Sequence, residues 1–312
     1  MDPHSAIGVP WDSFRKVLKV ILGLVFIFSA VLKIVDMDPF EIYVYSYGFF
    51  SFNLSLIVAR LAIVLELVLG IGLVTNCLHK LFWWGSVLML FGYTGLMIYA
   101  MVQGRTDNCH CFGDLLQFDP LRSLLKNLVL LLLFLFLYPL QGKRFRGQWP
   151  ALVGVVLFCT IGVFAVSPPD SFTHDSDPEH LLQRPLFEEM IHETPLASYG
   201  LDQGKKVVGL FSSSCDYCRL AARKISLMQR FYDFPEQDML YVFMGTEEGV
   251  RSFFAESEST EYPYLIYEDA IALLKIVDGK FPLIVMMQDG VVVHEYGLRN
   301  MDEKEIKLFF QK

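Results

Sequence analysis

The sequence predicts two parts of different fold class: an α-helical membrane bundle of five helices, followed by an α/β domain outside the membrane. Of the 312 residues, 54% are hydrophobic and 19% are charged, whereas soluble domains average about 45–50% apolar and about 25% charged residues. Residues 1–167 hold 9 acidic and 12 basic residues and residues 168–312 hold 25 and 14, so the net charge of -8 divides into +3 and -11. This asymmetry indicates two parts with different solvents. We expect a transmembrane domain over 1–167, a linker over 168–180 and an extracytoplasmic domain over 181–312.

Five apolar stretches are predicted to be membrane-spanning helices. Each is close to the ~20 apolar residues that cross a bilayer. Four of them form a core, and the fifth connects that core to the C-terminal domain. The stretches cover residues 16–35, 55–75, 81–103, 121–140 and 149–167.

The basic residues of the short loops predict the orientation of the bundle, because Lys and Arg concentrate on the cytoplasmic side. The 36–53 connector has no Lys or Arg, and the 104–120 connector has only Arg105. The N-terminus is therefore expected in the cytoplasm of a bacterium whose inner (cytoplasmic) membrane holds the bundle. The 104–120 loop and the C-terminal domain then face the periplasm. The loops of the opposite side carry Arg15, Lys16, Lys19, Lys80, Lys143, Arg144 and Arg146.

The C-terminal part alternates strand and helix patterns, as α/β domains do. Asp289-Gly290 is a hairpin turn signal between two apolar runs. No internal repeat, phosphate-binding loop or basic patch for nucleic acid is present in the sequence. The expected strands are 206–212, 239–245, 283–288 and 291–296, and the expected helices are 215–231, 247–257 and 301–311.

Cys215 and Cys218 open a predicted helix directly after a predicted strand. The free amides and the macrodipole at a helix N-terminus favour a thiolate, which lowers the pKa of the first cysteine below ~8.5. Residues three apart share one helix face, so the second thiol can resolve a mixed disulfide. The spacing therefore predicts a redox pair with Cys215 as the nucleophile.

The strand, the SCDYC sequence, Pro282 and the final hairpin and helix resemble the thioredoxin-like superfamily over about residues 181–312. The resemblance implies that Cys215 is the nucleophile, that Cys218 is the resolving thiol, and that Pro282 is a cis proline on the substrate side.

Three positions depart from the thioredoxin pattern. Gly209 stands where thioredoxins carry a buried acid, and Ser214 stands where they carry tryptophan. Asp216-Tyr217 replaces Gly-Pro, and a carboxylate beside Cys215 is expected to raise its pKa. We hypothesise from this that the pair is biased toward reducing behaviour.

Two other interpretations of the CxxC pair are weaker. A disulfide that only staples the helix would close too small a loop to stabilise much. A zinc site would need four ligands, and no second CxxC or His pair accompanies this one.

The membrane part resembles the DoxX/MauE group of redox-associated four-helix membrane proteins over residues 12–140. The resemblance is carried by FIFSAVLKIVDMDPF, LELVLGIGL and CHCFG. Members of this group are linked to disulfide or sulfur redox chemistry, which implies a redox role for Cys109 and Cys111. A Cys-x-Cys disulfide closes a strained ring and is expected to be more oxidising than an unstrained one.

Lys33 and Glu66 are charged residues inside predicted membrane helices and are functional candidates for that reason. The structural alternative is that Lys33 snorkels outward near Asp36 while Glu66 pairs within the bundle. Arg60 is expected to snorkel as well.

These features predict a membrane-anchored thiol-disulfide oxidoreductase. Cys109 and Cys111 would exchange electrons with Cys215 and Cys218, and the latter pair would act on extracytoplasmic protein thiols and disulfides. The redox equivalents would come from a quinone in the bundle or from a partner protein in the membrane. No other cofactor is expected.

Two alternatives from other functional classes remain open. Cu(I) prefers soft thiolate ligands, so Cys109, His110 and Cys111 could bind copper, with the thioredoxin-like domain keeping the cysteines reduced. His174 and His180 of the linker could contribute, although their spacing is loose. The chain could also be a redox-inactive accessory subunit of a larger membrane complex.

Overall fold

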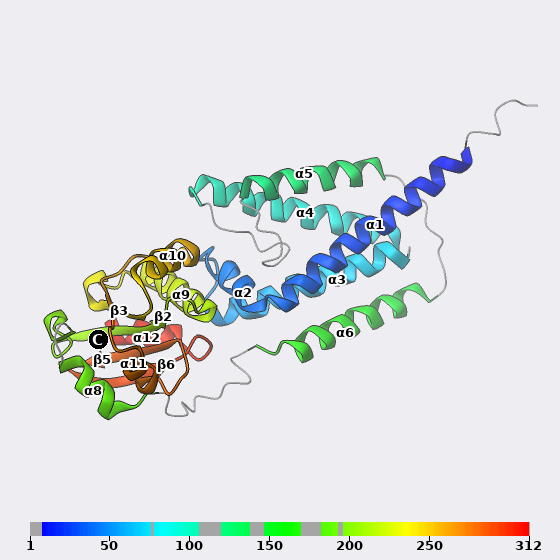
Figure 1. The fold of residues 1–312 in the computed structure, drawn as a ribbon. Coiled ribbons are helices and arrows are strands. Elements are labelled where there is room, and N and C mark those ends of the chain that lie inside the picture. The colour runs from blue at the N-terminus through cyan, green and yellow to red at the C-terminus, as the bar shows by residue number, and fades with distance from the viewer. Residues whose placement is uncertain are drawn as a thin grey trace, which may run out of the picture. The chain divides into compact units, whose positions relative to one another are not determined.

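The computed structural model describes residues 8–75, 78–105, 120–137, 147–169, 182–192 and 196–311. The chain forms two compact units. The membrane unit comprises Met1–Val44 and Leu54–Pro168, and the α/β unit comprises Tyr45–Asn53 and Pro169–Lys312. The predicted fold class, a helical membrane bundle followed by an α/β thioredoxin-like domain, is confirmed (Figure 1).

The membrane unit is built from long apolar helices. Among the described residues, four of them are long and apolar enough to cross a membrane, over Ser13–Val35, Phe52–Thr75, His79–Val102 and Gln148–Val166. The unit's helices are α1 (Gly8–Val35), α2 (Met37–Tyr45), α3 (Phe52–Thr75), α4 (His79–Val102), α5 (Pro120–Phe136) and α6 (Gln148–Val166).

Over their described residues, the five predicted spans coincide with helices to within one residue at the C-terminal ends, although α5 has only 17 residues. The short helix α2 was not predicted. It follows α1 after the single residue Asp36, and Pro39 lies in its first turn, where a missing N–H costs nothing. Apolar side chains such as Leu88 and Phe158, 73% and 76% exposed, cover the outside of the bundle. Such a surface suits lipid and not water.

Two glycines let α1 and α3 approach closely. A Cβ atom on Gly23 would lie 2.8 Å from the carbonyl oxygen of Gly70, and a Cβ atom on Gly70 would lie 2.8 Å from the carbonyl oxygen of Gly23. Small residues at such crossings are typical of membrane helix pairs, because packing and not the hydrophobic effect holds the helices together. α4 and α5 also pack against each other (Figure 1).

The α/β unit contains a five-stranded mixed sheet in the order β4-β3-β2-β5-β6. β2 is parallel to β3, with Val208 opposite Leu240, and antiparallel to β5, with Leu210 opposite Leu283. The hairpin turn between β5 and β6 is confirmed, since Asp289 and Gly290 have φ values of 50° and 81°. The strands are β2 (Lys205–Ser212), β3 (Met239–Met244), β4 (Tyr264–Ile266), β5 (Leu283–Gln288) and β6 (Val291–Tyr296).

Helices cover both faces of this sheet. One face packs against α8, η1 and α11 through a mainly aliphatic core. The other presents Phe211, Tyr241 and Phe243, whose rings contact Phe253 and Phe254 of α10. The elements are α8 (Arg184–His192), η1 (Leu196–Tyr199), α9 (Asp216–Tyr232), η2 (Glu236–Asp238), α10 (Glu247–Ser257), α11 (Ala270–Ile276) and α12 (Glu303–Gln311).

The predicted strands and helices of this unit are observed with small shifts at their ends. The short elements β4, α8 and α11 were missed, because β4 spans three residues and α11 spans seven. α11 is stabilised by Asp269, whose carboxylate accepts hydrogen bonds from the amides of Ile271 and Ala272 at 3.0 and 2.9 Å.

The contact between Gly23 and Gly70 gives a stability prediction. Gly70→Ala would force a methyl group against the α1 backbone, and overpacking of this kind costs about 1–3 kcal/mol. We expect a lower thermal unfolding midpoint for the purified protein in detergent. Gly95→Ala is the matched control, because nothing lies within 4 Å of a Cβ atom there. Equal midpoints for the two variants would contradict the close approach.

Candidate functional site: the Cys215–Cys218 pair and a buried ion pair

The chain passes from the buried strand β2 into helix α9 through Ser213, Ser214 and Cys215. Cys215 is the N-cap residue of α9, with an extended backbone conformation (φ -94°, ψ 119°). Its Sγ accepts a hydrogen bond from the backbone N–H of Cys218 at 3.3 Å. A sulfur in this position stabilises negative charge, because the first amides of a helix have no partner within the helix.

The two thiols of the pair have opposite environments. A hydrogen bond from the Cys218 side chain, together with the amides of Cys218 and Tyr217, lowers the pKa of Cys215 to about 6, against the opposing effects of burial and Asp216. Cys218 is fully buried, and burial raises the pKa of its thiol. These environments suit Cys215 to the predicted role of nucleophile and Cys218 to that of the protonated thiol behind it.

The expected influence of Asp216 is present but is outweighed. Its carboxylate does raise the pKa of Cys215, yet this is the smallest of the causes. Asp216 is exposed and pairs with Arg219 at 2.5 Å, which offsets its charge. The hypothesis that Asp216 biases the pair toward reducing behaviour is therefore not supported by the charge distribution around Cys215.

The serine loop before Cys215 is held by two glycines that the sequence analysis did not single out. A Cβ atom on Gly245 would lie 2.0 Å from the Ser213 hydroxyl oxygen, and one on Gly249 would lie 2.7 Å from it. The backbone of Gly245 has a φ of 154°. Gly-x-x-x-Gly at the start of α10 therefore provides the space in which Ser213 is buried.

The structure explains why no acid can occupy position 209. A Cβ atom on Gly209 would lie 2.6 Å from the ring of Phe211 and 2.9 Å from the ring of Tyr241. Aromatic side chains fill the place of a buried carboxylate. Proton transfer at the pair must use another group.

Pro282 lies at the end of β5 nearest the cysteine loop. The Phe281–Pro282 peptide bond is cis. β5 is antiparallel to β2, with Leu283 opposite Leu210. Pro282, one residue before Leu283, therefore lies beside the last residues of β2, after which the chain continues to Cys215.

Cys109 and Cys111 lie outside the described residues, as do His110 and the linker histidines His174 and His180. Among the described residues, no group of three or more His, Cys, Asp or Glu side chains could hold a metal ion.

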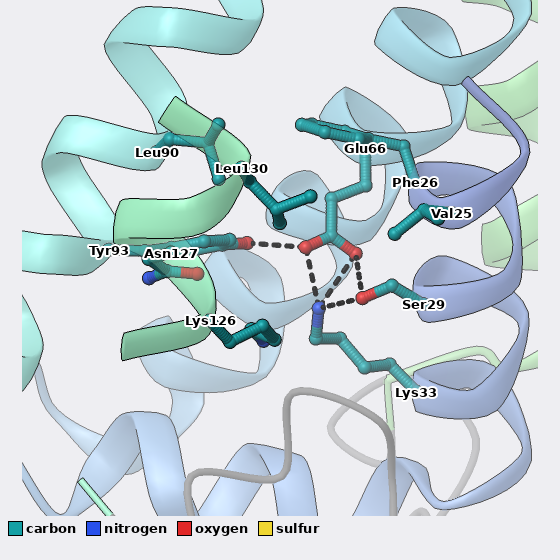
Figure 2. A pocket seen from close by; sticks show the side chains of 10 residues that line it. All are labelled: Val25, Phe26, Ser29, Lys33, Glu66, Leu90, Tyr93, Lys126, Asn127 and Leu130. Carbon is teal, nitrogen blue, oxygen red and sulfur yellow. Dashed lines mark hydrogen bonds and ion pairs between the residues drawn. The ribbon is translucent and has the colours of Figure 1, made fainter. Parts of the chain in front are cut away.

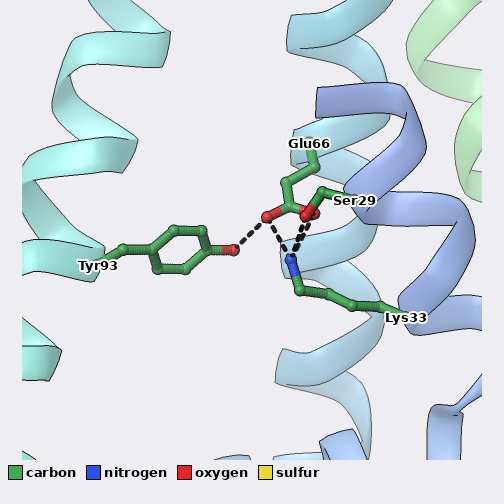
Figure 3. A network of polar contacts seen from close by, with 4 residues as sticks. All are labelled: Ser29, Lys33, Glu66 and Tyr93. Carbon is green, nitrogen blue, oxygen red and sulfur yellow. Dashed lines mark hydrogen bonds and ion pairs between the residues drawn. The ribbon is translucent and has the colours of Figure 1, made fainter. Parts of the chain in front are cut away.

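A second polar centre lies inside the membrane unit (Figure 3). Lys33 Nζ contacts Glu66 Oε1 and Oε2 at 2.5 and 2.7 Å and donates to the Ser29 hydroxyl at 3.0 Å. Ser29 donates to Glu66 Oε2 at 3.3 Å, and Tyr93 donates to Oε1 at 3.0 Å. The expectation that Lys33 snorkels toward Asp36 is wrong, because its charge is satisfied inside the bundle.

Arg60 is likewise buried and does not snorkel. Its guanidinium pairs with Glu41 at 2.5 Å and donates to the carbonyl oxygens of Ser167 and Pro168 at 2.7 and 2.9 Å. Intramembrane charges of this kind normally pair with each other or with backbone carbonyls.

The lowered pKa of Cys215 gives a kinetic prediction. The thiolate forms as the pH rises through about 6, so the alkylation rate of reduced Cys215 should rise to a plateau with an apparent pKa of about 6. Mass spectrometry of the Cys215 peptide after timed iodoacetamide treatment at different pH values measures this. Asp216→Asn should lower the apparent pKa further, whereas Glu188→Gln on α8 should leave it unchanged. An apparent pKa above 8 would contradict the assignment.

Comparisons with known proteins agree with the membrane part of this description. Residues 12–140 match the family model described as "Methylamine utilisation protein MauE". Over 302 aligned residues the chain is 26% identical to Protein TlpB of Flavobacterium psychrophilum, covering 80% of this chain and 82% of that protein. No solved structure matches the chain. The match supports the MauE part of the predicted resemblance at residues 12–140.

Proposed function

We propose that this chain is a membrane-anchored thiol-disulfide oxidoreductase whose CxxC pair acts on extracytoplasmic protein thiols. The observation that carries the proposal is the position of the Cys215 sulfur, which caps α9 and has a lowered pKa, with the buried thiol of Cys218 three residues later. The match of residues 12–140 to MauE and the similarity to TlpB support a membrane-associated redox role.

The chemistry proceeds through a mixed disulfide. With the pair oxidised, a substrate thiolate attacks one sulfur of the Cys215–Cys218 disulfide and releases the other cysteine. A second substrate thiolate then attacks the mixed disulfide. The substrate leaves as a disulfide, and the pair has gained two electrons and two protons.

The environment of Cys215 favours this direction. A group that stabilises the thiolate stabilises the reduced pair, and the disulfide is then a stronger oxidant. This is opposite to the reducing bias first expected from Asp216. Cys109 and Cys111 are the next acceptor in the proposal, because a strained CxC disulfide takes electrons from a less strained pair.

The proposed location follows from the charges of the loops. The N-terminus lies in the cytoplasm, the bundle in the bacterial inner membrane, and the α/β domain of residues 181–312 in the periplasm. Both cysteine pairs then share one oxidising compartment. The copper-binding alternative rests on residues outside the described part of the chain, and the accessory-subunit alternative stays open.

Trapping tests the CxxC chemistry. In Cys218→Ala the Cys215 thiolate can still attack a substrate disulfide, the reverse of the last step above, and one substrate thiolate leaves. With no Cys218 thiol to release it, Cys215 should remain linked to its substrates as mixed disulfides that disappear on reduction. Non-reducing electrophoresis of cells quenched with acid shows such species. Cys159→Ala is the control, because Cys159 is a buried cysteine of α6. If Cys218→Ala yields no adduct that depends on Cys215, the proposed function is wrong.

The relay between the two pairs is tested separately. If Cys109 and Cys111 accept electrons from the CxxC pair, Cys109→Ala should shift Cys215 and Cys218 toward the reduced form in cells. Thiol alkylation with a mass tag, followed by gel electrophoresis, measures this redox state. An unchanged redox state in Cys109→Ala would exclude the relay.

A further inference from the structure

The α/β unit contains a segment that lies far from residues 181–312 in the sequence. Residues Tyr45–Asn53 belong to this unit, although they precede most of the membrane helices. Tyr45, Ser46, Tyr47 and Phe52 are each at most 8% exposed. Short connecting segments normally run over the surface with their side chains in water. The burial of these residues therefore indicates a specific contact.

A turn fits the segment to helix α9. The amide of Gly48 donates to the carbonyl oxygen of Tyr45 at 2.9 Å, and the φ of Gly48 is 71°. A Cβ atom on Gly48 would lie 3.0 Å from the ring of Phe231 near the end of α9. The Tyr45 ring packs edge-on against the rings of Phe231 and Phe52, with both centroid distances 5.3 Å. Glycine therefore supplies both the positive φ and the room for this contact.

The buried charges of the two units are satisfied in different ways. In the membrane unit, Lys33 and Glu66 are paired with each other at 2.5 Å (Figure 2). In the α/β unit, Glu303 is the first residue of α12 and is 7% exposed. Two of its hydrogen-bond donors come from the segment: the backbone N–H of Phe52 at 2.6 Å and the hydroxyl of Tyr45 at 3.3 Å. A buried carboxylate is costly unless such bonds are made.

The amide of Phe52 needs an acceptor of this kind. Phe52 is the first residue of α3, and the first amides of a helix have no acceptor within the helix. The helix dipole also favours a carboxylate at this end. Glu303 therefore caps the amide from a position 251 residues away in the sequence.

Lys224 adds a second contact from α9. It is fully buried, and its ammonium donates to the carbonyl oxygens of Leu298 and Met301 at 3.1 Å each. Its Nζ also lies 3.6 Å from the centroid of the Phe52 ring, a cation–π contact that is stronger away from water. Because Met301 shortly precedes α12, Lys224 also fixes the chain that presents Glu303. The carboxylate and the ammonium thus hold one residue, Phe52, by its amide and by its ring.

We propose that Tyr45–Asn53 is a docking segment for the α/β domain, bound through Glu303 and Lys224, and that it attaches this domain to the membrane anchor independently of the 168–180 linker. The segment is covalently continuous with α3, which is long and apolar enough to cross a membrane. A domain that binds the segment therefore stays attached to that helix. The proposed orientation is compatible with this, since it puts the 36–53 connector on the same side of the membrane as the α/β domain.

Cleavage of the linker tests this attachment. A protease recognition sequence is inserted after Ser176 of the full chain, which carries an N-terminal affinity tag and is reconstituted in nanodiscs of neutral lipid. After complete cleavage, the nanodiscs are captured through the tag under reducing conditions, so that no disulfide joins the two fragments. We expect the C-terminal fragment to be captured with the nanodiscs. Its appearance in the unbound fraction would overturn the proposal.

Two double variants assign the retention to the segment. Tyr45→Ser with Phe52→Ser should release the fragment about tenfold faster, because truncating buried aromatic anchors weakens an interface. Phe49→Ser with Phe50→Ser is the matched control in the same segment, since these rings are 55% and 38% exposed. The control should retain the fragment as the parent chain does. Equal retention by the two double variants would overturn the proposal.

A substitution in α12 checks the same contact without altering the segment. Glu303→Gln keeps the shape of the side chain but leaves one acceptor oxygen fewer for the Phe52 amide. Hydrogen exchange of the uncut chain should become faster in the peptide that contains Phe52, while unchanged exchange in β2 and β3 shows that the sheet is intact. Glu305→Gln on the same helix is the control and should leave that peptide unchanged.

Equal exchange of the Phe52 peptide in the parent chain and in Glu303→Gln would contradict the contact. None of these measurements involves thiol chemistry, so a failure of trapping by Cys218→Ala would leave them unaffected. The docking segment and the proposed redox function can therefore fail independently.

Discussion

The buried ion pair between Lys33 and Glu66 is the interaction on which the membrane unit most depends. Charges inside a bilayer are stable only when they are paired and hydrogen-bonded. Here the Glu66 carboxylate of α3 is satisfied by Lys33 and Ser29 of α1 and by Tyr93 of α4. Because three helices must meet in one arrangement to satisfy a single carboxylate, the pair specifies their register. The small residues Gly23 and Gly70 then allow α1 and α3 to approach closely.

In the α/β unit the corresponding constraint is the start of helix α9. β2 ends three residues before Cys215, and the short segment between them is fixed by the packing of Ser213 against Gly245 and Gly249. The amides of the first turn then stabilise a thiolate at Cys215 while the burial of Cys218 keeps its proton. The reactivity of the pair is thus a consequence of backbone geometry, and the neighbouring charge of Asp216 changes it little.

The sequence was informative where the signal is local or periodic. Apolar runs predicted the membrane helices. Alternation and turn residues predicted the four longer strands and helix α9. Interactions between distant residues were not predictable: Lys33 and Glu66 are 33 positions apart, and Arg60 reaches the carbonyl of Ser167 across 107 positions. The prediction that Lys33 and Arg60 snorkel was wrong, because a single sequence does not show which charges can meet. The short elements β4 and α11 owe their structure to tertiary packing and one Asp269 cap, which propensity alone does not reveal.

In the proposed function, the geometry at Cys215 favours one direction of electron flow. Stabilising the Cys215 thiolate favours the reduced CxxC pair, so in this proposal electrons enter the pair from substrate thiols. In the same proposal the CxC disulfide accepts these electrons, because a strained disulfide is the stronger oxidant of the two.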